Sequence, residues 1–437
     1  MTTGKPTVAE VPVRIPVEAY VSEDYARAEN EKLWGKVWQI ACREEEIPKV
    51  GDYVTYDILD ESIIVVRSDP ETVSAFYNVC QHRGRRLTKG CGRTKQFFCR
   101  FHGWRWNLDG ESTYILDRED WCEALDAENT RLPRVQVDTW GGWVWINMDP
   151  DCEPLREYLN PVSPMLDAFD FDKMRYRWRQ WLYFPCNWKT ALESFIESFH
   201  VDATHPQLGQ WGTNRWWCRT GGKHAWHGIG TPRGDAGEID PRAAMYELFQ
   251  ELWDTVGTTT ETMVQAAARA KEELPEGAAP EEVAGFVMQT AAMADAERGV
   301  YWPQMTPEHY VECGLDWHVF PNSAILPGMT YALCYRARPN GYDPNSCIFE
   351  VYIIERYPEG AEPRTEWVYE PDPTEEKWRK ILSQDFQNMP EVQHGIKSRG
   401  FKGPRPSPVQ EVPVIHFHRT LAQYMGTGTP EDILARG

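Results

Sequence analysis

Two short segments of the chain each pair one cysteine with one histidine. Cys80 and His82 lie in Cys-Gln-His-Arg-Gly, and Cys99 and His102 lie in Cys-Arg-Phe-His-Gly-Trp. A glycine follows closely after each histidine, which lets the backbone bend near a ligand. Two thiolates and two imidazoles can hold a structural zinc ion or an iron–sulfur cluster. The spacing therefore predicts a metal centre that these four side chains build together.

A second group of candidate ligands follows about a hundred residues later. Glu193, Glu197 and His200 recur at spacings of four and three, which would place two carboxylates and an imidazole on one helical face. His205 lies about 140° from His200 around a regular helix, so both rings could face one metal only if the helix breaks. Pro206 predicts that break, because a proline pushes the preceding residue out of the helical backbone region. Taken alone, this segment is also typical of a solvated helix face.

A third candidate, Asp385, lies within the apolar stripe of a helix expected over residues 375 to 389. The stripe consists of Trp378, Ile381, Leu382 and Met389. A carboxylate on a face that packs into the core requires a partner. A metal, an arginine or backbone amides would each satisfy that requirement.

The composition is that of a large globular chain. Its 437 residues predict two or three domains, and 41% hydrophobic with 13% aromatic residues suffices for large cores. A formal charge of -20 opposes nucleic-acid binding, which needs clustered Lys and Arg. The one dense basic run, residues 83 to 89, lies inside the first Cys/His loop and is better explained as balancing charge on a thiolate-ligated centre.

The sequence also predicts the compartment. The first residues contain no apolar signal core, and the longest apolar region, near 316 to 335, is interrupted by Asp, His and Pro. We therefore expect no membrane span. Eleven cysteines without the spacing of a small disulfide-bonded domain favour a reducing compartment, and we expect a cytoplasmic protein.

Patterning along the chain predicts an α+β fold with two domains. A helix is expected over residues 22 to 36, with Ser22 as its N-cap. Short strands and turns from 38 to 155 predict a small antiparallel sheet domain around the Cys/His centre. Residues 1–37 and 156–437 are expected to form the second, larger domain.

Within the larger domain, residues 236–300 are Ala- and Glu-rich and predict a helical cap region. This region would either cover the active site or pack against another subunit. Residues 316 to 370 predict long antiparallel strands. His224 and His227 have no Cys or carboxylate close in sequence, which favours surface or core histidines over a further metal site.

Together the motifs resemble those of the Rieske non-haem iron oxygenases, in particular the large (alpha) subunits of aromatic ring-hydroxylating oxygenases. A Rieske cluster gives one iron two Cys and the other iron two His, as one Cys/His pair from each loop would allow. That family also has Asn-Trp-Lys, then Glu, an acidic residue and His-x-x-x-x-His, which this chain carries from residue 187 to 205. Two positions depart from the family: Ser194, where Asn is usual, and Glu197, where Asp is usual.

The resemblance implies a set of ligands. Cys80, His82, Cys99 and His102 would bind a [2Fe-2S] cluster. His200, His205 and Asp385 would bind a mononuclear Fe(II), because Asp385-Phe-Gln-Asn-Met matches the family's context for the third ligand; Glu391 is a less favoured substitute. Glu197 would connect an iron-bound imidazole with a cluster imidazole across a subunit boundary.

The resemblance also implies the fold and the reaction. The larger domain would contain an antiparallel sheet embraced by helices, a helix-grip or START-like arrangement with an apolar tunnel. Electrons from NAD(P)H would arrive through a ferredoxin or reductase, and O2 would hydroxylate an aromatic or other apolar cyclic substrate once or twice. The assembly would be a head-to-tail homotrimer, with or without a small beta subunit.

Two other classes of function remain open from the sequence. Oxidative O- or N-demethylation, or an amine-directed monooxygenase, would use the same metal centres, and some amine-directed members carry Glu at the bridging position. A Rieske electron carrier or a zinc-stabilised binding module would use the first motif without the second. Metal content separates the electron carrier and the zinc-stabilised module from the oxygenases, because an oxygenase requires about three irons per chain.

Overall fold

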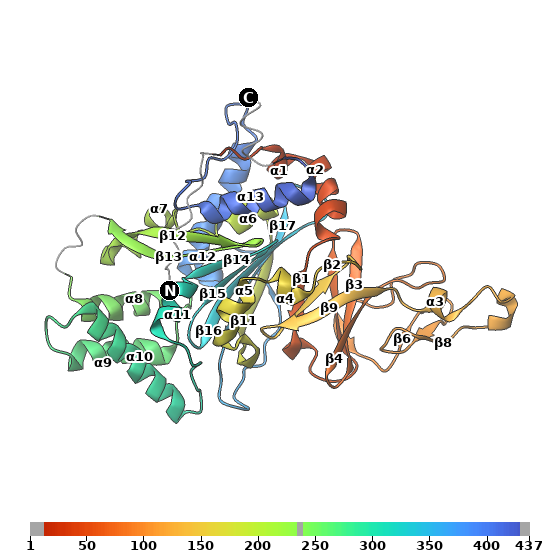
Figure 1. Ribbon diagram of the computed structural model, residues 1–437, viewed down its shortest axis with the longest axis horizontal. Helices are drawn as coiled ribbons and strands as arrows, with labels where there is room; N and C mark the ends of the chain where they lie inside the picture. The colour runs from red at the N-terminus through yellow and green to blue at the C-terminus, as the bar shows by residue number, and fades with distance from the viewer. Residues whose placement is uncertain (1–12, 234–238, 429–437) are drawn as a thin grey trace. The chain divides into compact units, whose positions relative to one another are not determined.

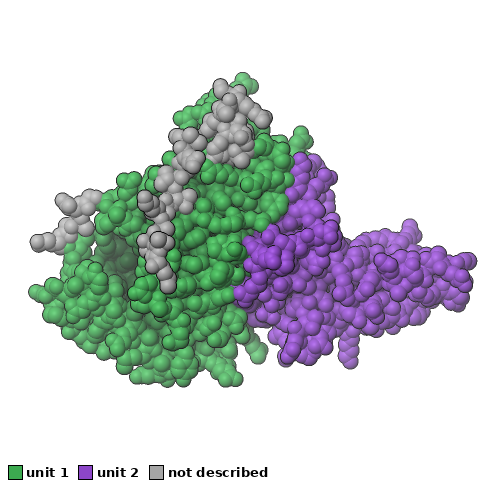
Figure 2. All heavy atoms as spheres, viewed as in Figure 1, with its two compact units in different colours: residues 1–26, 159–437 green, residues 27–158 purple. Residues whose placement is uncertain are grey.

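The chain separates into two compact units, residues 27–158 and residues 1–26 with 159–437 (Figure 2). The computed structural model describes residues 13–233 and 239–428. The expected larger domain therefore includes residues 1–12 and 429–437, and the expected cap includes residues 236–238, which lie outside the described part. The smaller unit begins before residue 38 because residues 27–37 join it: Gln39 Nε2 donates to Trp34 O at 2.7 Å in a buried position.

The smaller unit is built around an antiparallel sheet of seven strands. Their spatial order is β1 (Gln39–Arg43), β10 (Trp143–Asn147), β9 (Arg134–Trp140), β4 (Thr72–Tyr77), β3 (Glu61–Asp69), β2 (Asp52–Ile58) and β5 (Cys91–Arg93). A three-stranded sheet extends from it: β6 (Phe97–Phe98), β7 (Arg105–Trp106) and β8 (Ser112–Tyr114). Cys80 follows β4 and Cys99 follows β6, so the two Cys/His loops are tips of strands.

The larger unit contains an eight-stranded sheet. Its spatial order is β12 (Thr213–Gly221), β13 (His224–Arg233), β14 (Asp316–Val319), β15 (Ser323–Pro327), β16 (Tyr331–Pro339), β17 (Cys347–Glu355), β11 (Arg175–Phe184) and β18 (Val368–Tyr369). All neighbours are antiparallel except β11 and β18. β16 and β17 are buried along almost their whole length. A strand that is buried on both faces needs no alternation of polar residues, which these sequences lack.

Helices cover this sheet (Figure 1). α6 (Trp188–Glu193) packs on β16 and β17, and α13 (Val412–Met425) packs on β12 and β13. α12 (Glu375–Ile396) packs on α6. The remaining helices are α1 (Glu18–Val21), α2 (Glu23–Glu29), α3 (Ala127–Thr130), α4 (Leu155–Tyr158), α5 (Val162–Leu166), α7 (Val201–Thr204), α8 (Pro241–Thr255), α9 (Glu261–Glu273), α10 (Pro280–Glu297) and α11 (Pro307–Cys313).

The α+β class and the helix-covered antiparallel sheet expected from the sequence are confirmed. The expected helix over 22–36 forms as α2 followed by a π-helix, Asn30–Trp34. Within the described residues, no helix combines the length and the apolar character that crossing a membrane requires.

Asn187 fixes the start of α6 and ties that helix to distant parts of the larger unit. Its side-chain oxygen accepts from the backbone N–H of Lys189 at 3.0 Å, as an N-cap does. Its amide group donates to the backbone oxygens of Tyr20 at 3.2 Å and Pro344 at 3.1 Å. These bonds anchor the chain immediately before the His-rich segment.

We expect Asn187→Ala to lower the free energy of unfolding by about 2 kcal/mol, because it removes both the cap and buried hydrogen bonds. Asn187→Asp keeps the cap acceptor but loses the donors, so its cost should be intermediate. The control is Thr306→Ala, which removes the exposed N-cap of α11 and should cost about 1 kcal/mol. Urea unfolding monitored by tryptophan fluorescence measures all three. Equal costs for Asn187→Ala and Thr306→Ala would contradict the anchoring role.

Candidate functional site

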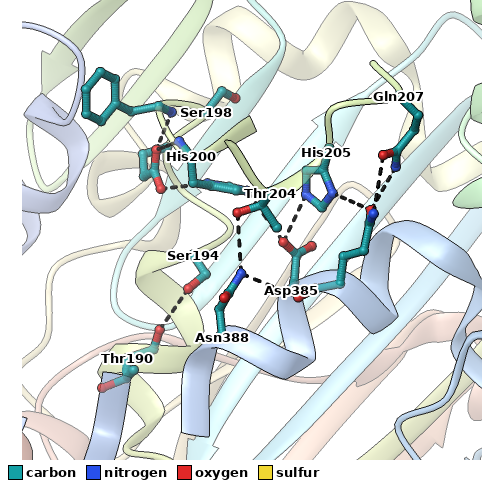
Figure 3. Close-up of polar contacts among 12 residues, drawn as sticks. Thr190, Ser194, Ser198, His200, Thr204, His205, Gln207, Asp385 and Asn388 are labelled. Carbon is teal, nitrogen blue, oxygen red and sulfur yellow. Dashed lines mark hydrogen bonds and ion pairs between the residues drawn. The ribbon is translucent and has the colours of Figure 1, made fainter. Parts of the chain in front are cut away.

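The structure brings His200, His205 and Asp385 together in the larger unit. The nitrogen and oxygen atoms that could bind a metal all lie within 4.8 Å of one another. His205 Nε2 is 2.9 Å from Asp385 Oδ1, and His200 Nε2 is 3.6 Å from the same oxygen. Figure 3 shows the side chains of His205 and Asp385 facing each other from different segments. Two imidazoles and one carboxylate on one side of a point are the donor set of a non-haem Fe(II) site with open positions.

Each histidine is held so that its Nε2 faces this point. Glu197 Oε1 lies 2.7 Å from His200 Nδ1, and Gln384 Oε1 lies 2.9 Å from His205 Nδ1. Both oxygens are acceptors, so each Nδ1 carries the proton and donates it. The lone pair on each Nε2 is then directed towards Asp385, which is the tautomer that a metal ligand requires. The donors therefore fit an iron site.

Gln384 is a site residue that the sequence did not reveal. It orients His205 and also accepts from Gln207 Nε2 at 2.7 Å. Its signal in the sequence is only that it precedes Asp385 on α12. A second contact between the two segments comes from Asn388 Nδ2, which donates to Thr204 Oγ1 at 3.4 Å. α12 thus contributes both the carboxylate and the groups that align α7 with it.

The single helix expected to carry Glu193, Glu197 and His200 on one face is wrong. α6 ends at Glu193, and the chain is irregular until α7 begins after His200. Phe195 is buried in this break and stacks on Tyr335 at 4.2 Å between ring centroids. Its packing favours leaving the helix, because burying an aromatic ring outweighs the helix propensity of a few residues.

The structure also shows the conformation of His205 and the contact of Ser194 in this segment. His205 has φ -120° and ψ 61°, outside the helical region, as expected for a residue before Pro206. Ser194, where the family usually has Asn, donates its hydroxyl to Thr190 O at 3.3 Å. The irregular segment before His200 and the turn at His205 together provide the helix break that the sequence required.

Glu193 lies in a separate network because of this break. Its Oε1 accepts from Tyr20 at 2.8 Å and lies 2.7 Å from His418 Nε2. Burial and then the Glu193 carboxylate raise the pKa of Tyr20 well above its usual value. Glu193 therefore links α1, α6 and α13 and does not face the three candidate ligands.

Both carboxylate oxygens of Glu197 are used within the chain. Oε1 faces the His200 ring, while Oε2 accepts from the backbone N–H groups of Phe199 and His200, the latter at 3.2 Å. Burial alone would lower the pKa of His200, but Glu197 and then Asp385 favour its charged form, and the pKa is raised. Nearby Glu411 has its pKa raised to about 7, first by burial and also by Glu197. Glu197 therefore raises the pKa of two neighbouring groups, His200 and Glu411.

In the smaller unit, the four predicted cluster residues also lie together. The rings of His82 and His102 are 4.4 Å apart between centroids, and the thiols of Cys80 and Cys99 are buried neighbours. Burial is the main cause that raises the pKa of the Cys80 thiol, and the adjacent Cys99 adds to it. His82 Nδ1 is buried without a hydrogen-bond partner, and the ring stacks on Trp104 at 5.3 Å. An unsatisfied ring nitrogen beside two thiols fits a metal ligand.

The two loops repeat one turn. Gly84 N donates to Cys80 O at 2.9 Å, and Gly103 N donates to Cys99 O at 3.0 Å. Both glycines have positive φ, 73° and 79°, which residues with a Cβ rarely adopt. Each glycine therefore closes the loop that presents one Cys and one His.

A cavity of about 350 Å³ opens beside His200, His205 and Asp385. Its walls are mainly apolar and come from the sheet and from α8; they include Trp216, Leu248, Leu252, Leu326, Leu333 and Tyr335. Within the described residues, no Lys or Arg lines it. The predicted cap therefore contributes to the cavity wall through α8.

His224 and His227, which were expected to be surface or core residues, are buried at 0% and 1% exposure.

Comparison with known proteins agrees with this geometry. Residues 171–427 match the model of the ring hydroxylating alpha subunit (catalytic domain), and residues 37–120 match the Rieske [2Fe-2S] domain. The carnitine monooxygenase oxygenase subunit of Escherichia coli (strain K12) is 31% identical over 195 residues, 44% of this chain and 52% of that protein. The chlorobenzene dioxygenase alpha subunit of Cupriavidus sp. (strain PS12) is 30% identical over 191 residues, 42% of each chain. The matches thus span about half the length of these relatives.

Solved structures share the fold. A quaternary ammonium Rieske monooxygenase in complex with L-carnitine superposes with a TM-score of 0.64 at 19% identity, covering 96% of this chain and 97% of that one. Naphthalene 1,2-dioxygenase bound to phenanthrene superposes with a TM-score of 0.65 at 17% identity, covering 95% and 93%. The two matched domains imply a Rieske cluster and a mononuclear iron. Because the catalytic-domain match spans more than half of the chain, the protein belongs to the family of ring-hydroxylating alpha subunits, with a Rieske domain earlier in the same chain.

Proposed function

We propose that this chain is the oxygenase component of a Rieske non-haem iron system. Cys80, His82, Cys99 and His102 hold the [2Fe-2S] cluster, and His200, His205 and Asp385 hold Fe(II). The observation that carries the proposal is the orientation of both Nε2 atoms towards Asp385, fixed by acceptors on both Nδ1 atoms. Glu391 is exposed on α12, which supports Asp385 as the third ligand.

The iron centres supply electron transfer and the activation of O2 when they are bound. The protein residues position them and control access. Glu197 and Gln384 keep the imidazoles in their binding tautomer, and the apolar cavity holds the substrate beside the open positions while excluding water. Electrons are proposed to come from NAD(P)H through a partner reductase or ferredoxin, as the resemblance to the family implies, and the lack of a nicotinamide fingerprint in the sequence is consistent with this.

The cavity supports a neutral, apolar, cyclic substrate that is hydroxylated once or twice. Its walls carry the acidic residues Glu197, Asp202, Asp316 and Asp385, and no described Lys or Arg lines it. A substrate with a carboxylate would be repelled by Glu197 and would find no described Lys or Arg side chain to pair with. An aromatic hydrocarbon, by contrast, would fill the space against rings and aliphatic side chains.

An amine-directed monooxygenase is the second candidate. Carnitine monooxygenase and glycine betaine monooxygenase subunits are among the similar relatives. Trp211, Trp216, Tyr331 and Tyr335 line the cavity, and such rings attract ammonium groups. Carnitine and betaine also carry a carboxylate, which this cavity does not accommodate, so the amine would have to be a simple cation.

Glu197 is proposed to lie on the electron path. Its carboxylate fixes His200 and still has lone pairs for a donor from a cluster histidine of a neighbouring chain. A head-to-tail trimer is the simplest closed assembly that brings the two together.

The first test is the metal content. We expect about three irons per chain in the wild type and about two in Asp385→Ala, with the cluster spectrum unchanged, because the cluster has its own ligands. Glu391→Ala is the matched control on the same helix and should keep all three. Elemental analysis with electron paramagnetic resonance measures both centres. Stoichiometric zinc in place of iron would refute the proposal. Loss of iron in Glu391→Ala but not in Asp385→Ala would identify Glu391 as the third ligand in place of Asp385.

The second test addresses Glu197. We expect Glu197→Gln to keep both metals and a reducible cluster but to lose most product formation, because an amide lacks the charge that holds two N–H donors. Glu197→Asp is one methylene shorter and should also lower turnover. Product formation, cluster reduction and the molecular mass in solution are measured together. Wild-type turnover in Glu197→Gln, or a fully active monomer, would exclude this electron path.

The third test separates the substrate classes. With a surrogate ferredoxin and reductase, we expect naphthalene to give product-coupled oxygen uptake at least about tenfold above 2-naphthoate, because like charges in the cavity exclude the carboxylate. A trimethyl(naphthylmethyl)ammonium salt reports on the second candidate. If that salt is oxidised faster than naphthalene, the amine-directed function is the better one.

A further inference from the structure

Asp316 is a buried acid in the wall of the catalytic cavity. It lines the cavity together with His200, His205 and Asp385, and only 4% of the residue is exposed. Its Oδ1 atom is buried without any hydrogen-bond partner in the described protein. Buried polar atoms are usually paired, so an unpaired carboxyl oxygen at a cavity indicates a partner that the protein itself does not provide.

The backbone holds Asp316 in this position. It is the first residue of β14, and its Cα pairs with His227 of β13. Gly314 just before it has φ 71°, and a Cβ there would lie 2.5 Å from His227 O. Leu315 N donates to the same oxygen at 2.8 Å. This close approach fixes the backbone at Asp316, a residue that lines the cavity.

The nearest polar side chains do not satisfy Asp316. His227 is paired with Ser198, whose hydroxyl lies 2.7 Å from His227 Nε2, and burial lowers the pKa of His227 to about 4, so it is uncharged. Burial, and then the charge of Glu197, raise the pKa of Asp316 well above its usual value. Among the described groups acting on it, only the N–H of Trp317 favours the ionised form. Asp316 is therefore a neutral carboxylic acid in the empty cavity.

We propose that Asp316 anchors the substrate through a two-point hydrogen bond with a hydroxyl group, so that the preferred substrate is an apolar ring compound that already carries an alcohol or phenol. This inference rests on the proposed oxygenase function of the same cavity. A neutral carboxyl group offers one donor and one acceptor, and a hydroxyl group offers the same pair. A hydrocarbon leaves Oδ1 unpaired, and an anion is repelled by Glu197.

Ligand binding to the iron-loaded protein without oxygen tests the anchor independently of turnover. The probes are naphthalene, 2-naphthol and protonated 2-naphthylmethylamine, with binding followed by titration calorimetry. We expect 2-naphthol to bind the wild type about tenfold more tightly than naphthalene, as one buried hydrogen-bonded pair would give. Asp316→Asn keeps a donor and an acceptor and should retain that preference, whereas Asp316→Leu should lose it.

Asn214→Leu is the matched control, because Asn214 lines the same cavity and the change is likewise from polar to apolar. It should keep the preference for 2-naphthol. Thermal unfolding separates anchoring from a structural role: Asp316→Leu removes an unsatisfied buried group and should melt no lower than the wild type, whereas a structural Asp316 would make the variant less stable.

Several results would overturn the inference. Equal binding of naphthalene and 2-naphthol, no binding of either probe, or loss of the preference in Asn214→Leu but not in Asp316→Leu would each do so. Preferential binding of 2-naphthylmethylamine that disappears in Asp316→Asn would show that Asp316 acts as an anion for a cationic substrate. Iron content measured on the same samples separates failure of the proposed function from failure of the anchor. A protein that binds no iron contradicts the proposed oxygenase function. A protein that binds iron but shows no preference for 2-naphthol contradicts only the anchoring role of Asp316.

Discussion

The buried carboxylate of Asp385 is the constraint on which the rest of the larger unit depends. A carboxyl group that is 4% exposed is costly to bury unless charges or donors compensate it. The compensation would come from a metal ion held between Asp385, His200 and His205; the two histidines are brought to Asp385 by a break in the chain before α7 and a turn at its end. Gln384 and Glu197 then hold the imidazoles from behind. The irregular backbone around α7 and the buried carboxyl group of Asp385 therefore belong to the same site.

The sheet gives this arrangement a rigid frame and an apolar cavity. β16 and β17 are buried along nearly their whole length, and Phe195 packs on their aromatic residues at the point where the helix ends. A well-packed layer of this kind resists deformation, so the strands give the cavity one rigid wall, and α8 and the segment before β12 complete it. In that wall, within the described part of the chain, Trp216 Nε1 and Asp316 Oδ1 are the buried polar atoms without partners, and only the oxygen can accept a hydrogen bond.

The cluster loops of the smaller unit follow a simpler logic. Two turns of the same kind, each closed by a glycine with positive φ, present one Cys and one His. Local sequence determines such turns, because the ligands lie within two or three residues of each other. The pairing of the two turns needs the sheet, which places the loop after β4 beside the loop after β6.

The sequence by itself determined the ligand types, the α+β class and the order of the two metal-binding regions, because these depend on residue identity and short spacings. The resemblance to the family singled out Asp385, whereas its place on an apolar stripe left a metal, an arginine and backbone amides equally open as its partner. Prediction from the sequence failed where contacts between distant segments decide the backbone: a continuous helix through Glu197 was expected, but the burial of Phe195 against the sheet and the bonds from Glu197 to its own backbone interrupt it. Gln384 and Asp316 could not be recognised for the same reason. Their roles arise from what tertiary packing places beside them, an imidazole in one case and an apolar cavity in the other.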